Sequence, residues 1–199
     1  MSYRIEEKIP MTINDAGEFI SSLKNLGMKI LYPERVISSD YFDTNRFCLF
    51  RDSEEGLLPR KKVRIRHYPF SELGNSSLEI KISSIEGRFK EVSKLTDIEE
   101  EKLIANGYFD SVYGLLEKKI NVSYSRSYFE YGQVRITCDT DIKYKDLKSN
   151  SNLFYEKDAV IEIKASDKTS LDYLTKLIPS KRRRFSKYCN AIKYLNLSN

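Results

Sequence analysis

The side chains best suited to chemistry in this sequence alternate with aliphatic residues along short segments. Arg64 and Arg66 alternate in this way with Val63 and Ile65. Successive side chains of a β-strand point to opposite faces, so both guanidinium groups would share one face. A guanidinium group is a planar fork that matches two phosphate oxygens. A strand of this kind therefore suits the binding of an anion such as phosphate.

The same alternation recurs in other segments of the chain. The charged or polar sets are Arg4, Glu6 and Lys8; Glu79 and Lys81; Arg135, Thr137, Asp139 and Asp141; and Glu162 and Lys164. One such face is ordinarily the solvated side of an antiparallel sheet. These faces, however, combine Arg and Lys with a few carboxylates, and isolated carboxylates among cations also suit a divalent metal. The combination favours a site for a polyphosphate–metal complex, in which Asp139 and Asp141 either support the metal or neutralise neighbouring Arg.

The elements that must position these side chains are mostly strands. Alternating segments cover residues 2–10, 36–44, 61–68, 77–83, 121–132, 133–144 and 158–166, separated by Gly, Ser, Asn and Pro clusters. Apolar residues at helical spacing predict helices at 12–27, 96–107, 170–179 and 183–197. The fold class is therefore α+β. If the sheet closes with its charged faces inward, the barrel would hold water and ligand where small barrels hold apolar side chains.

Composition limits the remaining possibilities. The 199 residues suit one domain, and 34 Lys and Arg against 29 Asp and Glu give a net charge of +5, which favours an anionic partner. Three widely spaced cysteines without a CxxC pair argue against a disulfide framework or a zinc site. The single histidine, His67, falls on the face opposite Arg64 and Arg66, so we expect a surface or wall residue rather than a member of a catalytic triad. No apolar run is long enough for a membrane span and no signal peptide is evident, so we expect a soluble, cytoplasmic chain.

Eight short segments occur in an order typical of one known family. They are RIEEKI, SDYFDT, KVRIRHY, LEIKIS, YSRSYFE, VRITCDTDI, VIEIKAS and RFSKY. From Arg4 to about Ile192 the chain thus resembles the VTC (vacuolar transporter chaperone type) domain of the CYTH, or triphosphate tunnel metalloenzyme, superfamily. The resemblance implies a single domain over residues 1–199. Its fold would be an eight-stranded antiparallel β-barrel with flanking helices and a C-terminal helix, whose tunnel binds triphosphate and a divalent metal.

The resemblance also implies roles for individual residues. The phosphate-binding residues would be Lys8, Arg64, Arg66, Lys81, Lys90, Tyr124, Arg126, Arg135, Ser186 and Lys187. Lys8, Arg64, Arg66, Lys81, Arg126, Glu162 and Lys187 would be catalytic, and Glu162 would bind the metal, Mn²⁺ or Mg²⁺. The ExExK signature of the superfamily appears as Arg4-x-Glu6-x-Lys8, so one carboxylate is missing. This departure matches VTC domains better than the hydrolase or cyclase branches.

The resemblance implies a metal-dependent polyphosphate polymerase that transfers the γ-phosphoryl group of ATP onto a growing polyphosphate chain. Two alternatives stay open: an inorganic or nucleoside triphosphatase on the same fold, and a non-catalytic module that binds polyphosphate or inositol phosphates. ATP and polyphosphate or triphosphate would be the ligands, with a membrane protein as a partner for product export. The basic run KRRRFSKY is typical of a solvated helix start, so we expect no nucleic-acid partner.

Overall fold

A computed structural model describes residues 4–70, 76–149, 152–166, 169, 173, 177 and 185–197, without the side chains of Arg4 and Ile5. Its strands are β1 (Arg4–Thr12), β2 (Lys29–Asp43), β3 (Arg60–His67), β4 (Ser77–Ser84), β5 (Gly87–Lys94), β6 (Tyr108–Asp110), β7 (Gly114–Tyr131), β8 (Val134–Asp146), β9 (Leu153–Tyr155) and β10 (Asp158–Ser166). The helices in this part of the chain are α1 (Ile13–Asn25), α2 (Cys48–Glu55), α3 (Asp97–Asn106) and α5 (Lys187–Tyr194).

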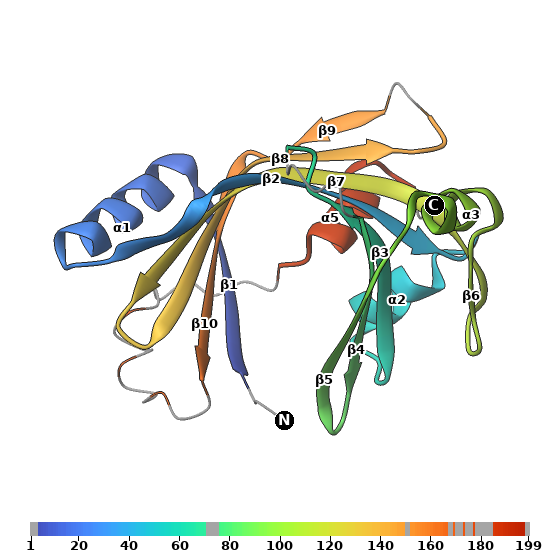
Figure 1. The fold of residues 1–199 in the computed structure, drawn as a ribbon, viewed down its shortest axis with the longest axis horizontal. Coiled ribbons are helices and arrows are strands. Elements are labelled where there is room, and N and C mark those ends of the chain that lie inside the picture. Colours follow the sequence, from blue (N-terminus) through green and yellow to red (C-terminus); the bar gives the residue numbers. More distant parts are fainter. Residues whose placement is uncertain are drawn as a thin grey trace. The chain divides into compact units, whose positions relative to one another are not determined.

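The strands form one hydrogen-bonded sheet in the order β1-β10-β8-β7-β2-β3-β4-β5, with β6 beside β7 and β9 beside β8 (Figure 1). Neighbouring strands pair in antiparallel register, as in β1 with β10, β10 with β8 and β3 with β4. The α+β class and the antiparallel sheet are therefore confirmed, and the main path has the expected eight strands. In the described residues this path is open, because β1 and β5 are its end strands.

The chain divides into two compact units, and the first comprises Met1–Arg35, Tyr124–Ile142 and Glu156–Phe185. Its core lies where α1 packs on one face of the sheet. Ala16, Ile20 and Leu23 recur at helical spacing on α1 and pack with Ile161 and Ile163 of β10. The Thr12 hydroxyl begins α1 by accepting a hydrogen bond from the Asp15 N–H at 3.1 Å. The other face of β10 is left for polar side chains.

The second unit comprises Val36–Ser123, Lys143–Tyr155 and Ser186–Asn199. Val63 and Ile65 of β3 are completely buried, in a core that also contains Phe42 and Leu49. Helix α3 begins with the predicted capping box, in which Thr96 and Glu99 satisfy each other's backbone N–H groups. The aliphatic side of the alternating β3 pattern thus lies in the core, as the sequence predicts.

The helices agree with the sequence in part. Helices α1 and α3 are confirmed, each slightly shorter than its expected range, and α5 (Lys187–Tyr194) confirms about half of the helix expected at 183–197. Helix α2 was not predicted, and the reason is the position of its cap: the Asp43 carboxylate accepts the Leu49 and Phe50 N–H groups, each at 3.0 Å. Of the helix expected at 170–179, only Tyr173 and Leu177 lie within the described residues, and both are helical. No described helix has the length and apolar character of a membrane span.

Candidate functional site

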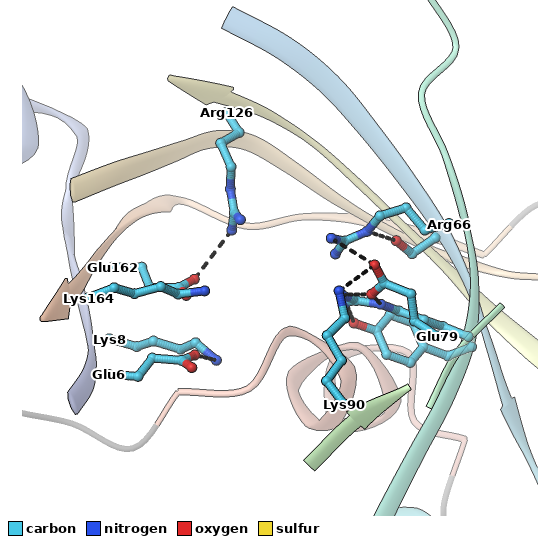
Figure 2. A network of polar contacts seen from close by, with 11 residues as sticks. Glu6, Lys8, Arg66, Glu79, Lys90, Arg126, Glu162 and Lys164 are labelled. Carbon is cyan, nitrogen blue, oxygen red and sulfur yellow. Dashed lines mark hydrogen bonds and ion pairs between the residues drawn. The ribbon is translucent and has the colours of Figure 1, made fainter. Parts of the chain in front are cut away.

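The second unit carries a cluster of cations around one buried carboxylate, Glu79. The β3–β4 register places Glu79 directly opposite Arg64. Arg64 Nε and Nη2 donate to Glu79 Oε2 at 2.8 and 2.5 Å, and Arg66 Nη1 lies 3.6 Å from Oε1. Lys90 Nζ donates to Oε1 at 2.8 Å (Figure 2). Arg64, Arg66, Glu79 and Lys90 are named the Glu79 cluster below.

Three charged side chains of the Glu79 cluster are buried, whereas the fourth, Lys90, is exposed. The arginines are each 8% exposed and Glu79 is 3% exposed. Burial would raise the pKa of the Glu79 carboxyl, but the positive charges of Arg64 and Arg66 hold it at about 2. Arg64 is further oriented by Tyr41, whose hydroxyl accepts a hydrogen bond from Nη1 at 2.7 Å. The guanidinium groups are thus fixed before any ligand arrives.

Three lysines extend this face across neighbouring strands. Lys62 of β3, Lys81 of β4 and Lys90 of β5 are consecutive partners in the sheet register, and paired residues of antiparallel strands share a face. Lys81 and Lys90 belong to the predicted phosphate-binding set, whereas Lys62 does not. Lys62 lies two residues before Arg64, so the alternation that places Arg64 and Arg66 on one face also predicts Lys62 on that face.

Helix α5 contributes the predicted C-terminal residues. Ser186 is the N-cap of α5: its hydroxyl accepts a hydrogen bond from the Cys189 N–H at 3.3 Å, and Lys62 Nζ donates to it at 2.8 Å. Lys187 is the first helical residue and is half-buried. The Tyr188 hydroxyl donates a short hydrogen bond to Asp43, so the helix is held to the end of β2. Ser186 and Lys187 therefore belong to the same unit as the Glu79 cluster.

The first unit carries a second cluster, around Glu162. The register places Lys8 of β1 opposite Glu162 of β10, and Lys164 Nζ lies 2.8 Å from Glu162 Oε1. Arg126 Nη2 of β7 lies 3.4 Å from Glu162 Oε2, and Lys8 Nζ lies 3.0 Å from Glu6 Oε1 (Figure 2). Burial would raise the pKa of the Glu162 carboxyl, but Lys8, Arg126 and Lys164 hold it well below its usual range. Glu6, Lys8, Arg126, Glu162 and Lys164 are named the Glu162 cluster.

Arg126 is fixed mainly by another carboxylate. Its Nε and Nη2 donate to the two oxygens of Asp139 at 2.5 and 2.7 Å, a two-point contact with a fully buried side chain. The Arg126 guanidinium also lies 5.2 Å from the centre of the Tyr124 ring. Asp139 therefore neutralises Arg126, which is one of the two roles expected for it. Asp141 is exposed.

Arg135 and Thr137 complete the polar face of β8. The Arg135 guanidinium lies 5.9 Å from the Tyr128 ring centre, and Thr137 is opposite Glu162 in the β8–β10 register. Of the predicted site residues, the first unit contains Lys8, Tyr124, Arg126, Arg135 and Glu162, and the second unit contains Arg64, Arg66, Lys81, Lys90, Ser186 and Lys187. Tyr41, Glu79, Asp139 and Thr137 lie beside them although the resemblance gave them no role.

Comparison with known proteins decides the family. The sequence profile of the VTC domain matches residues 3–196. The chain belongs to the VTC domain family. This match spans nearly the whole sequence and confirms the resemblance of the eight segments. A search of curated proteins finds no match to the chain.

Solved structures agree on the fold of this VTC domain. A candidate adenylate cyclase from Bacillus halodurans superposes with a TM-score of 0.59 at 18% identity, covering 98% of this chain and 90% of that one. A candidate adenylate cyclase from Vibrio parahaemolyticus gives a TM-score of 0.57 at 16% identity, with 96% and 98% covered. At these identities the likeness concerns the fold, which is that of the triphosphate tunnel superfamily.

Enzymes of this superfamily use divalent metals, so the fit of the residues to such an ion has to be tested. The described residues contain no group of three or more His, Cys, Asp or Glu that would form a metal site. Mg²⁺ and similar ions, however, are often held by one or two carboxylates together with substrate phosphates. Glu162 fits this pattern, because its carboxylate stays ionised among cations that would also attract the phosphates. The site thus suits a metal that binds together with a triphosphate.

Proposed function

We propose that this VTC domain is a metal-dependent polyphosphate polymerase, which transfers the γ-phosphoryl group of ATP onto a growing polyphosphate chain. The observation that supports this most is the pair of clusters around the buried carboxylates Glu79 and Glu162, in which carboxylates fix Arg and Lys side chains before a ligand binds. Phosphoryl transfer requires little covalent chemistry from a protein, because positioning and charge neutralisation provide most of the catalysis. Fixed cations supply both.

The surroundings of the residues support a proposed role for each of them. Arg64 and Arg66, with Lys81 and Lys90 nearby, would bind phosphate oxygens, and Arg126 would do so in the first unit. Glu162 would hold a divalent cation, Mn²⁺ or Mg²⁺, which neutralises negative charge on the bound phosphates. The Arg and Lys side chains of the protein would orient the phosphoryl donor and attract the acceptor phosphate.

The choice of acceptor separates the polymerase from a triphosphatase. A second carboxylate at the position of Arg4 would favour another metal ion and an activated water. Arg4 instead carries a positive charge, which disfavours a second cation and attracts an anionic acceptor. Its backbone pairs with Ser166 at the end of β1, and its side chain lies outside the described part of the structure. We therefore propose that phosphate competes better than water as the nucleophile.

The test is an incubation of the protein with ATP and Mn²⁺, with phosphorus species resolved by chain length over time. Chains longer than triphosphate are the expected product. ADP and orthophosphate alone would identify a triphosphatase, and cyclic AMP would identify the activity named for the Bacillus and Vibrio structures. Binding of polyphosphate without any turnover would identify a binding module.

A matched pair of variants connects the activity to the site. Glu162→Gln keeps the size of the side chain and removes its charge, so turnover should fall by orders of magnitude. Glu130→Gln removes the charge of an exposed carboxylate in the same unit and should keep turnover near that of the wild type. Equal activity of both variants would remove Glu162 from the site.

A further inference from the structure

Thr137, in the first unit, has a polar side chain that has been given no role so far and that does not stabilise the free protein. It lies on β8 between Arg135 and Asp139, and the register sets it opposite Glu162. Its neighbours Ile136 and Cys138 point to the other face and belong to the core with α1. The Thr137 side chain therefore shares the polar face with the Glu162 cluster.

The Thr137 hydroxyl is buried without a hydrogen-bond partner in the part of the chain that the structure describes. The residue is 2% exposed, and neither Thr137 Oγ1 nor the Nε of Arg135 finds a partner there. A buried hydroxyl without a partner destabilises the folded protein, whereas a valine fills nearly the same space at no such cost. The hydroxyl thus contributes nothing evident to the free fold.

The chemistry of the two groups indicates which ligand would satisfy them. The Nε of an arginine can only donate, so its partner has to be an acceptor. Lys8, Arg126 and Lys164 make the surroundings of Glu162 positive, which favours an anion as the source of acceptor atoms. Oxygen atoms of a phosphate chain meet both requirements.

We propose that Thr137 is a phosphate-binding residue, whose hydroxyl donates a hydrogen bond to a non-bridging oxygen of the phosphate chain. Arg135, two residues before Thr137 on β8, would donate its Nε–H to the same phosphate chain, and Glu162, which would hold the metal, lies opposite Thr137 on β10. This inference rests on the proposed function in that the site binds a phosphate chain, but it requires no particular reaction. It assigns the hydroxyl to ligand affinity rather than to folding.

If the hydroxyl binds phosphate, removing it should weaken phosphate binding but not destabilise the free protein, and the experiment measures both quantities. Thr137→Val removes the hydroxyl and keeps the shape, and Thr137→Ser keeps the hydroxyl. Thermal unfolding of the free proteins and calorimetric titration with tripolyphosphate, each with and without Mn²⁺, are compared with the wild type. Thr137→Val should unfold at the same or a higher temperature, yet bind tripolyphosphate about tenfold more weakly. Thr137→Ser should bind within about twofold of the wild type.

Three results would overturn the assignment, and they are distinguishable. A clear loss of thermal stability in Thr137→Val, with unchanged affinity, would show that the hydroxyl has a structural partner. A loss of affinity seen only with Mn²⁺ would place the hydroxyl on the cation rather than on phosphate. Wild-type protein that fails to bind tripolyphosphate would overturn the proposed function along with the role of Thr137.

Discussion

Replacement of Glu79 by Gln tests whether the carboxylate at the centre of the Glu79 cluster is a built-in counter-ion. Glu79 contacts Arg64, Arg66 and Lys90 and is 3% exposed. Gln keeps the size and one acceptor oxygen but leaves these cations without their negative partner. The free protein should therefore lose stability, while the uncompensated cations attract an anionic ligand more strongly.

The magnitude follows from the pKa of Glu79. A fall from 4.5 to about 2, at about 1.4 kcal/mol per pKa unit, corresponds to about 3 kcal/mol of stability from the ionised carboxylate. Because the folded protein lowers this pKa, the contribution is complete above the unfolded value of 4.5 and disappears as the pH falls toward 2. Glu79→Gln should thus be less stable than the wild type by about 3 kcal/mol at neutral pH, and the difference should shrink at acidic pH.

Urea unfolding of both proteins from about pH 7 to about pH 2.5 measures this difference. Glu91→Gln is the control, because Glu91 is exposed and its partner Ile80 points away from the cluster. It should follow the wild type at every pH. A second titration with tripolyphosphate at neutral pH should stabilise Glu79→Gln more than the wild type.

A constant difference between wild type and Glu79→Gln across this pH range would refute the reasoning, because the loss would then come from packing rather than from charge. Weaker stabilisation of Glu79→Gln by tripolyphosphate would refute the second part. Glu79 would then orient the arginines for phosphate instead of competing with phosphate for them.

Two further changes test other contacts. Tyr188→Phe removes the hydroxyl that donates to the fully buried Asp43, so we expect a lower unfolding temperature. Because α5 also carries Ser186 and Lys187, the KM for ATP should rise. An unchanged KM would show that α5 does not contact the substrate. Glu162→Gln should lose Mn²⁺ binding in the presence of tripolyphosphate, followed by the paramagnetic resonance of the ion, while far-UV circular dichroism stays that of the wild type; retained Mn²⁺ binding would assign the metal to another group.

Local patterns were enough to predict much of the fold. The alternation of Arg64 and Arg66 with Val63 and Ile65 has the period of a strand, and the structure buries these two aliphatic residues completely. The capping box at Thr96 is likewise a signal within four residues. Helix α2 was missed because its N-terminal N–H groups are satisfied by Asp43, which lies on β2 rather than at the helix start.

The partners of the charged side chains could not be predicted in the same way, because they depend on strand register. Glu79 and Arg64 are 15 residues apart, and Arg126 and Asp139 are 13 apart. The alternation placed Arg64, Glu79 and Asp139 on charged faces, and the resemblance implied a role for Arg126, but neither predicted a pairing across strands. Thr137 was also grouped with its face from the alternation alone, and only its burial opposite Glu162 distinguishes it from an ordinary strand threonine.

The contacts of the buried carboxylates support the proposal that Glu162 is the metal ligand. Both oxygens of Asp139 are taken by Arg126 at 2.5 and 2.7 Å, and both oxygens of Glu79 face cations. In the described part of the chain, Glu162 lies 2.8 Å from Lys164 and 3.4 Å from Arg126, and Lys8 faces it in the β1–β10 register. An ionised carboxylate can accept about four hydrogen bonds. Glu162 can therefore bind a further ligand, whereas both oxygens of Asp139 already accept from Arg126. Glu162 can exchange its contact with Lys164 for a contact with a metal bound to phosphate, and the two-point pair of Arg126 with Asp139 stays intact.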